Sequence, residues 1–176
     1  MSALRHLVHP GPVTPDRRES LADGESRALR VTLPPGASLH DGIVAALDAI
    51  GARSAAFTLL GGRFAALKYC IAAPNPQGPQ VARYSTPIPA GLCVVLGGGG
   101  AAGLTPDGAP IIHCHAVLAD DAGQAFGGHL LPQESFADTD DPPVLLARAY
   151  RRIAIAQRPD PETAMTIFHP AEVPHA

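Results

Sequence analysis

Charged and aromatic side chains are scarce in this sequence. Charged residues make up 16% of the 176 residues, aromatic residues make up 5%, and tryptophan is absent. The net charge of −3 argues against a surface that binds duplex DNA, because such a surface needs clustered lysine and arginine. Lys68 is the one lysine in the chain. A surface with so few charges suggests that other subunits cover part of it.

Cysteines and long apolar runs are also scarce. The three cysteines, Cys70, Cys93 and Cys114, are widely spaced and form no Cys-x-x-Cys pair, which excludes a zinc ribbon and a thioredoxin-type redox motif. The N-terminus lacks the apolar stretch of a signal peptide, and the glycine-rich uncharged run Gly91–Pro106 is too short to span a bilayer. We therefore expect a soluble, cytoplasmic protein with no membrane partner.

The chain length is typical of one domain with a sizeable core. Residues 1–27 are rich in proline and charge and show no sustained apolar period, so we expect an N-terminal arm there. The domain itself is expected over residues 28–170, followed by a C-terminal tail over 171–176.

One segment, Ser38–Gly51, has the pattern of an amphipathic helix. Ser38 can cap its first turn, and Asp41 lies where the helix dipole favours a carboxylate. Apolar residues then recur at steps of three and four, and Gly51 stands where a left-handed residue ends many helices. Such an apolar stripe needs a sheet to pack against.

Most other segments have the pattern of strands. Gly61-Gly62 predicts a two-residue hairpin between two of them, and Gly97–Gly100 is expected to end another. The expected strands are 28–33, 54–60, 63–72, 91–96, 151–157 and 164–169, with a proline-rich loop or edge connection over 74–89 and a helical turn over 142–150. Many antiparallel strands with one good helix predict an α+β fold.

The segment Ile111–Leu131 predicts a β-hairpin that carries three histidines. Asp121-Ala122-Gly123 separates two strand-like runs, and Gly123 can take the left-handed conformation that a three-residue loop requires. Asp120 then pairs with Gln124, and counting back places His115 opposite His129 and His113 opposite Leu131. A loop one residue longer or shorter would send His129 to the other face. With this loop, His113, His115 and His129 share one side of the ribbon.

This arrangement favours a metal site. Residues two apart on a strand point to one side, with Cα atoms about 6.6–6.8 Å apart, a span that two imidazoles can close onto one ion. Neutral imidazole is the commonest metal ligand, and three of them leave one zinc coordination position open for water or a ligand. Zinc is the favoured divalent metal, while iron, nickel, copper and manganese stay open. The alternative is a set of hydrogen-bonded structural histidines.

Other candidate chemistry has weaker support. Gly97–Gly100 lacks the spacing of a phosphate-binding loop, so a turn or a close backbone approach is expected there. Cys114 alternates to the face opposite His113 and His115, which predicts packing rather than metal ligation. The arginines Arg148, Arg151, Arg152 and Arg158 are close in sequence without interleaved aromatics, and we expect them on a solvated or subunit-facing surface.

The order of these features resembles the PPC (plants and prokaryotes conserved) domain family, in its prokaryotic stand-alone form. The resemblance depends on the segment Leu33–Leu39, on Gly51, and above all on His113-Cys114-His115 followed by Gly123–Leu130 with its Gly-Gly-His-Leu element. It implies a curved, largely antiparallel sheet wrapped around one main helix, assembled as a homotrimer. It also implies a metal site near a subunit boundary, at positions that match His113, His115 and His129.

Three hypotheses for function follow. The first is a metal-binding homotrimer that binds or processes a small-molecule ligand at the three histidines, with no general base that the sequence identifies. The second is a transcription-related DNA-binding or scaffolding protein, although the chain is acidic and lacks the Arg-Gly-Arg-Pro hook of plant family members. The third is a structural oligomer whose histidines have no catalytic role.

Overall fold

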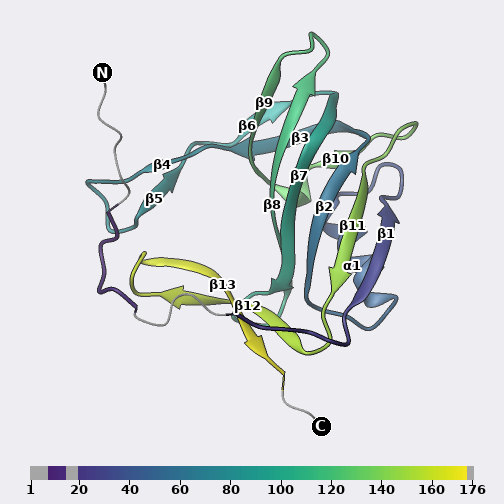
Figure 1. Cartoon of the computed structure of the whole chain (residues 1–176). Coiled ribbons are helices and arrows are strands. Elements are labelled where there is room, and N and C mark those ends of the chain that lie inside the picture. Colours follow the sequence, from purple (N-terminus) through teal and green to yellow (C-terminus); the bar gives the residue numbers. More distant parts are fainter. Residues whose placement is uncertain (1–7, 15–19, 174–176) are drawn as a thin grey trace.

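The computed structural model describes residues 8–14 and 20–173 of the chain. The remaining parts of the predicted arm, residues 1–7 and 15–19, and residues 174–176 of the predicted tail lie outside the described residues. Figure 1 shows a large twisted sheet with a single helix, α1, against one of its faces. No helix in the described part of the chain is long and apolar enough to cross a membrane.

The main sheet is almost entirely antiparallel, which confirms the predicted α+β class. Along its principal path the strands are ordered β1 (Arg27–Thr32), β11 (Val144–Ala149), β2 (Ala55–Gly61), β7 (Cys93–Leu104), β8 (Pro110–Asp120), β9 (Ala125–Leu130), β3 (Arg63–Cys70) and β10 (Phe136–Ala137). Off this path, β6 (Ile88–Ala90) pairs with β3, and β12 (Ile153–Asp160) pairs with β13 (Met165–Glu172) and touches β7. A separate ribbon joins β4 (Ala72–Pro74) to β5 (Ala82–Tyr84), and a 3-10 turn spans Pro132–Glu134.

The predicted helix is confirmed as α1 (Leu39–Asp48). The Ser38 hydroxyl accepts a hydrogen bond from the amide of Asp41 at 3.0 Å, which satisfies one of the unpaired amides of the first turn. Gly51 follows with a φ of +64°, a conformation that glycine adopts at little cost. The apolar stripe of α1 is buried against the sheet, where Leu39, Ile43 and Leu47 join the core.

The hairpin predicted at Gly61-Gly62 is wrong. Strands β2 and β3 do not pair with each other, and both run antiparallel to β7, with Leu59 opposite Gly98 and Arg63 opposite Val94. Gly62 has a φ of +89°, and its backbone carbonyl accepts a hydrogen bond from the amide of Val95 at 2.9 Å. The chain therefore continues from β2 into β3 alongside β7, with a kink at the two glycines, and does not turn back on itself.

The break predicted at Gly97–Gly100 is also wrong. Strand β7 continues through these glycines to Leu104, and each of them pairs with a residue of β8. A Cβ on Gly100 would lie 2.0 Å from the carbonyl oxygen of His113, and one on Gly98 would lie 2.6 Å from that of His115. The glycines thus provide the close backbone approach that was the other expectation for this segment.

The helical turn predicted over 142–150 is wrong as well, because residues 144–149 form β11 between β1 and β2. Its side chains alternate in burial: Leu145, Ala147 and Ala149 are buried, whereas Leu146 is exposed. That period of two is the pattern of a strand with one face on the core. The two closing strands are confirmed as β12 and β13, with a turn between them.

The hairpin of β12 and β13 is anchored at both ends. At one end the amide of Ile155 donates to the Ser54 hydroxyl at 2.9 Å, next to the single parallel pairing of Ala156 with Leu104. At the other end, residues 8–14 of the arm pack on the turn, where Glu162 accepts from the amide of Thr14 at 3.0 Å and lies 2.5 Å from His9 Nδ1. The Ser54 hydrogen bond and the pairing with β7 therefore hold the hairpin against the main sheet, and the arm covers its turn.

Candidate metal centre

The turn of the histidine hairpin forms as predicted. Gly123 has a φ of +74°, and its amide donates to the carbonyl of Asp120 at 2.9 Å. The amide of Asp120 donates to the carbonyl of Gln124 at 3.1 Å, and the Asp120 carboxylate accepts from the amides of Ala122 and Gln124. This local chemistry fixes the register, and His115 lies directly opposite His129, which confirms that part of the prediction. The paired register ends there, so His113 has no partner at Leu131.

The three histidines come together on one face of the hairpin. Their nearest ring nitrogens all lie within 4.8 Å of one another. The ring centroids are 4.8 Å apart for His113 and His115, 4.8 Å for His113 and His129, and 5.2 Å for His115 and His129. Alternation along β8 turns the neighbouring side chains, Ile112 and Cys114, into the core. The opposite face of this strand is thereby free for ligands.

The spacing of these nitrogens fits a metal ion. His129 Nδ1 lies 3.3 Å from His115 Nε2. Zinc–nitrogen bonds of about 2.0–2.1 Å in tetrahedral geometry place two ligand nitrogens about 3.3 Å apart. Two of the three nitrogens thus already have the separation that one zinc ion requires, and His113 lies within reach of the same point.

The surroundings of the site lower the pKa values of His113 and His129. Burial, reinforced by repulsion from His113 and then His115, lowers the pKa of His129 to about 4. Burial, and after it repulsion from His115, also lowers the pKa of His113. A metal binds the neutral ring, so protons compete little for these two residues at neutral pH.

The cysteines are not part of the site. Cys70, Cys93 and Cys114 are all buried with free thiols, as expected for small core residues. Burial raises the pKa of the Cys114 thiol to about 12 and that of Cys93 to about 11. A thiolate is the form that binds metal or attacks a substrate, so the thiols of Cys93 and Cys114 are unreactive at neutral pH.

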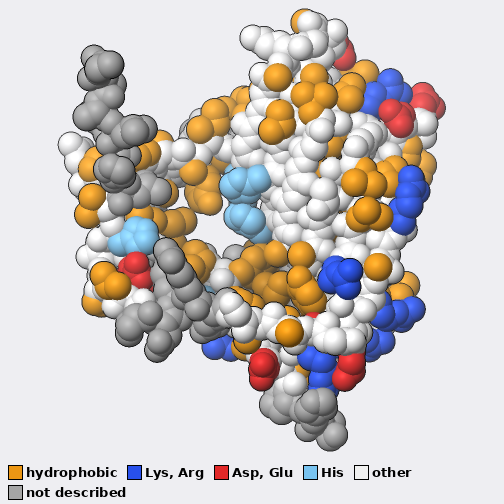
Figure 2. Space-filling view, viewed as in Figure 1, with side chains coloured by type: hydrophobic (Ala, Val, Ile, Leu, Met, Phe, Trp, Pro, Cys, Tyr) orange, Lys and Arg blue, Asp and Glu red, His pale blue; other side chains and the backbone are white. Residues whose placement is uncertain are grey.

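A hollow lies beside the histidines, and sequence reasoning did not identify its other walls. In Figure 2 histidine side chains border a hollow near the centre of the view. The hollow has a volume of about 860 Å³, including its open mouth, and is lined by Tyr84, His113, His129, Gln157, Met165, Thr166, Ile167 and Phe168. Tyr84 lies in the proline-rich segment and Phe168 near the C-terminus, and no short-range pattern connects either residue to the hairpin.

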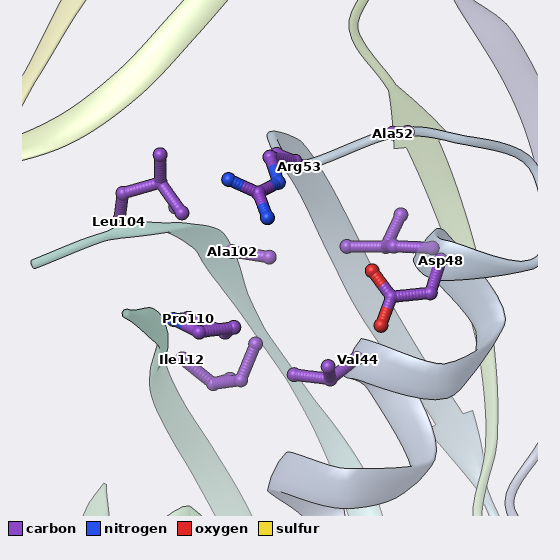
Figure 3. A pocket seen from close by; sticks show the side chains of 10 residues that line it. Val44, Asp48, Ala52, Arg53, Ala102, Leu104, Pro110 and Ile112 are labelled. Carbon is purple, nitrogen blue, oxygen red and sulfur yellow. The ribbon is translucent and has the colours of Figure 1, made fainter. Parts of the chain in front are cut away.

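A second, smaller hollow lies elsewhere, between the end of α1 and the β7–β8 hairpin. It has a volume of about 290 Å³, and its walls include Val44, Ala102 and Ile112. Figure 3 shows the side chains of Asp48 and Arg53 beside these apolar groups. Neither histidine nor cysteine lines this space, so its residues offer no alternative to the three-histidine site.

Three of the arginines have acidic or polar partners among the described residues. Arg63 donates to the Asp138 carboxylate at 2.9 Å, and Arg152 Nε lies 3.5 Å from a carboxylate oxygen of Glu25. Arg148 donates to the hydroxyl of Ser26 at 3.0 Å. Each of these three guanidinium groups therefore has an acidic or polar partner.

Comparison with known proteins adds a family and a fold. The model of the Plants and Prokaryotes Conserved (PCC) domain matches residues 21–139. No curated protein sequence matches the chain significantly.

Several solved structures share the fold. A PPC protein from Pyrococcus horikoshii aligns with a TM-score of 0.59 at 22% identity over 92% of this chain and 100% of its own. A candidate DNA-binding protein from Ralstonia eutropha JMP134 aligns with a TM-score of 0.61 at 17% identity, over 83% of this chain and 96% of its own. A metal-containing protein from Archaeoglobus fulgidus aligns with a TM-score of 0.57 at 19% identity, over 85% of this chain and 96% of its own.

Proposed function

Since the chain belongs to the Plants and Prokaryotes Conserved (PCC) domain family, we propose that it is a zinc-binding homotrimer that binds a small ligand at His113, His115 and His129. Residues 28–170 are the proposed functional domain. The observation that carries the proposal is the 3.3 Å separation of His129 Nδ1 and His115 Nε2, which equals the edge of a zinc coordination tetrahedron. The description of the solved neighbour from Archaeoglobus fulgidus as metal-containing supports a metal at this fold.

Zinc bound by three histidines keeps one coordination position for a water molecule or a ligand atom. The residues of this chain then decide what occurs at that position. The polar side chains that line the hollow besides the histidines are Tyr84, Gln157 and Thr166, and no carboxylate is among them. Hydrolysis at a metal commonly needs a general base within hydrogen-bond reach of the water. These walls are better suited to hold a ligand than to activate water, so we favour binding or sensing over catalysis.

The homotrimer is proposed because the family resemblance implies it, and an apolar surface next to the site supports a subunit contact. Leu60, Leu96, Val117 and Leu146 are exposed on β2, β7, β8 and β11, on strands whose other side chains face the core. Leu96 keeps 57% of its surface exposed and Val117 keeps 52%. Exposed apolar surface of this kind is typical of subunit contacts. His115 projects from the same side of β8 as Val117, so a partner on this face would lie beside the metal centre.

The metal content of the purified protein tests the proposal. We expect about one zinc ion per chain by elemental analysis, and loss of that ion from the double variant His113→Ala/His115→Ala, because one imidazole alone cannot hold it. His40→Ala is the matched control, since His40 lies beside Asp41 and takes no part in the cluster. Undiminished metal in the double variant would contradict the proposal. A protein without metal in every form would favour the structural oligomer.

DNA binding is the second candidate function. Two solved neighbours, from Ralstonia eutropha and Bacteroides thetaiotaomicron, are described as candidate DNA-binding proteins. The net charge of −3 argues against it, and Arg63 and Arg152 already face carboxylates, because affinity for duplex DNA comes largely from phosphate contacts with unpaired cations. We therefore place it after metal-dependent ligand binding.

A further inference from the structure

The walls of the histidine hollow come mainly from outside the family match. Five of its eight lining residues, Gln157, Met165, Thr166, Ile167 and Phe168, belong to β12 and β13, whereas the PCC match ends at residue 139. The position of β12 depends on Gly103, because a Cβ there would lie 2.4 Å from the carbonyl oxygen of Ile155. This chain therefore builds a fixed wall opposite its histidines.

Two aromatic rings flank the histidines in this hollow. The ring of Tyr84 lies 5.1 Å from that of His129, and the ring of Phe168 lies 6.3 Å from that of His113 in an edge-on arrangement. Aromatic rings at such separations favour other planar groups between or beside them. Met165 and Ile167 add apolar surface next to Phe168. The hollow thus has a flat, apolar surface close to the position proposed for the metal.

The charges around the hollow indicate which charge its ligand should carry. Asp, Glu, Lys and Arg are all missing from its lining, which includes His113 and His129, and imidazole is a neutral ligand when it binds a metal. A divalent ion held by three neutral imidazoles would carry its full positive charge into this partly enclosed space. An anionic oxygen at the fourth position would offset that charge, whereas a neutral group would not.

From these observations we infer that the hollow binds a small organic anion with a planar apolar body, its anionic oxygen toward the metal and its ring beside Tyr84 and Phe168. Gln157 and Thr166 supply hydrogen-bonding groups for the rim of the ligand. The inference rests on the proposed metal site and adds the chemical class of the ligand. Tyr84 and Phe168 are specificity-determining residues in this assignment.

Three probes that differ in charge and in the presence of a ring test this assignment on the full chain loaded with cobalt(II). Benzoate has both the charge and the ring, benzamide has the ring without the charge, and acetate has the charge without the ring. We expect benzoate to bind at least about tenfold more tightly than either of the others. Visible absorption of the cobalt reports each binding event directly.

A double variant tests whether the preference for benzoate depends on the rings of Tyr84 and Phe168. Tyr84→Leu/Phe168→Leu keeps apolar volume but removes both planes, and it should reduce the preference for benzoate over acetate to about twofold while acetate binds as before. Phe136→Leu is the control, because Phe136 is an exposed aromatic on β10, outside the hollow. The cobalt spectrum of each variant shows whether its metal centre is intact.

The outcomes distinguish a failure of the proposed ligand class from a failure of the proposed metal site. Cobalt bound to the histidines, with equal affinity for benzoate, benzamide and acetate, would overturn the ligand class and leave the metal site standing. A benzoate preference that survives in the double variant would overturn the assignment to Tyr84 and Phe168. A chain that binds no cobalt would overturn the proposed function, and the inference with it.

Discussion

The side chain of His129 shows how one residue is prepared for a metal. It is half-buried between the other two histidines and Tyr84, whose ring is 5.1 Å away. Burial and the neighbouring imidazoles keep its pKa near 4, far below the usual value of about 6.5. An exposed histidine would carry a proton in a sizeable share of molecules near pH 6.5, and a metal would have to displace it. His129 offers its nitrogen without that competition.

The lowered pKa of His129 predicts an acid-sensitive fold when no metal is bound. Between about pH 6.5 and pH 4 the unfolded chain takes up a proton at this residue that the folded chain does not. The free energy of unfolding therefore falls as the pH drops through this window, and it is unaffected by this residue above about pH 6.5. We expect thermal unfolding in the presence of a chelator to shift to lower temperature between pH 7 and pH 4.5.

Comparison with a variant isolates the contribution of His129, because carboxylates such as Asp138 also titrate in acid. His129→Gln keeps a polar side chain but cannot take up a proton, so its unfolding temperature should fall less over the same interval. Circular dichroism melts of both proteins at the two pH values measure the difference. Equal falls in the two proteins would show that His129 is not the group responsible.

At the scale of elements, the site depends on how closely two strands approach. β8 carries His113 and His115, and β7 lies against it with glycine at positions 97–100. Side chains at Gly98 or Gly100 would meet the carbonyl oxygens of His115 and His113. The glycines therefore set the backbone position of the two histidines without touching their rings.

A methyl group at Gly100 should disturb both stability and metal binding. In Gly100→Ala the new Cβ would lie 2.0 Å from the His113 carbonyl oxygen and 2.7 Å from Phe57 Cζ, so β7 and β8 must separate. We expect a loss of about 1–3 kcal/mol in the free energy of unfolding, as for other overpacked sites, and weaker zinc binding. Denaturant unfolding and a metal titration measure the two effects.

Gly97→Ala is the matched control on the same strand, because no atom lies within 4 Å of a Cβ at that position. It should keep the zinc affinity of the natural chain and lose less stability than Gly100→Ala, because a methyl group here meets no other part of its own chain. A loss in Gly97→Ala as large as that in Gly100→Ala would show that any added side chain weakens this strand. The close contact between a side chain at position 100 and the His113 carbonyl would then not be the cause of the loss in Gly100→Ala.

Elements with local causes were predictable from the sequence, whereas elements fixed by distant partners were not. The Ser38 cap and the Gly123 turn each depend on hydrogen bonds within five residues, and both form as expected. The glycines at 61 and 62 resemble a hairpin turn locally, but their conformation is set by the long strand β7 beside them. Residues 144–149 become a strand because β1 and β2 lie on either side.

At the scale of the whole molecule, the candidate site is only partly local. The three histidines fall on one hairpin, so their spacing and the turn were enough to identify them as a candidate set. Tyr84 and Phe168 reach them from the proline-rich segment and from β13, which are far from the hairpin in sequence. Their approach depends on how the β4–β5 ribbon and the β12–β13 hairpin are held, and single-sequence patterns do not encode that.

The proposed homotrimer is expected to use the apolar outer face of the sheet as its subunit contact. We expect sedimentation equilibrium to give about 54 kDa, three times the 18.1 kDa of one chain. Leu96→Glu/Val117→Glu places two charges on this face and should yield smaller species, because burying unpaired carboxylates is costly. Val8→Glu, on the exposed arm, is the control. A double variant that stays trimeric would exclude this face as the subunit contact.

The distribution of charge over the molecule predicts weak or absent DNA binding. The chain carries sixteen acidic residues against thirteen basic ones, and Arg63 and Arg152 face carboxylates. Each phosphate contact requires a cation that is free to replace a counterion, so affinity for random duplex DNA should be unmeasurable even at low salt, where such contacts are strongest. Fluorescence anisotropy with a labelled duplex tests this, with an arginine-rich peptide as the positive control. Binding that falls steeply as salt is added would overturn this prediction and favour the nucleic-acid function over the metal-dependent one.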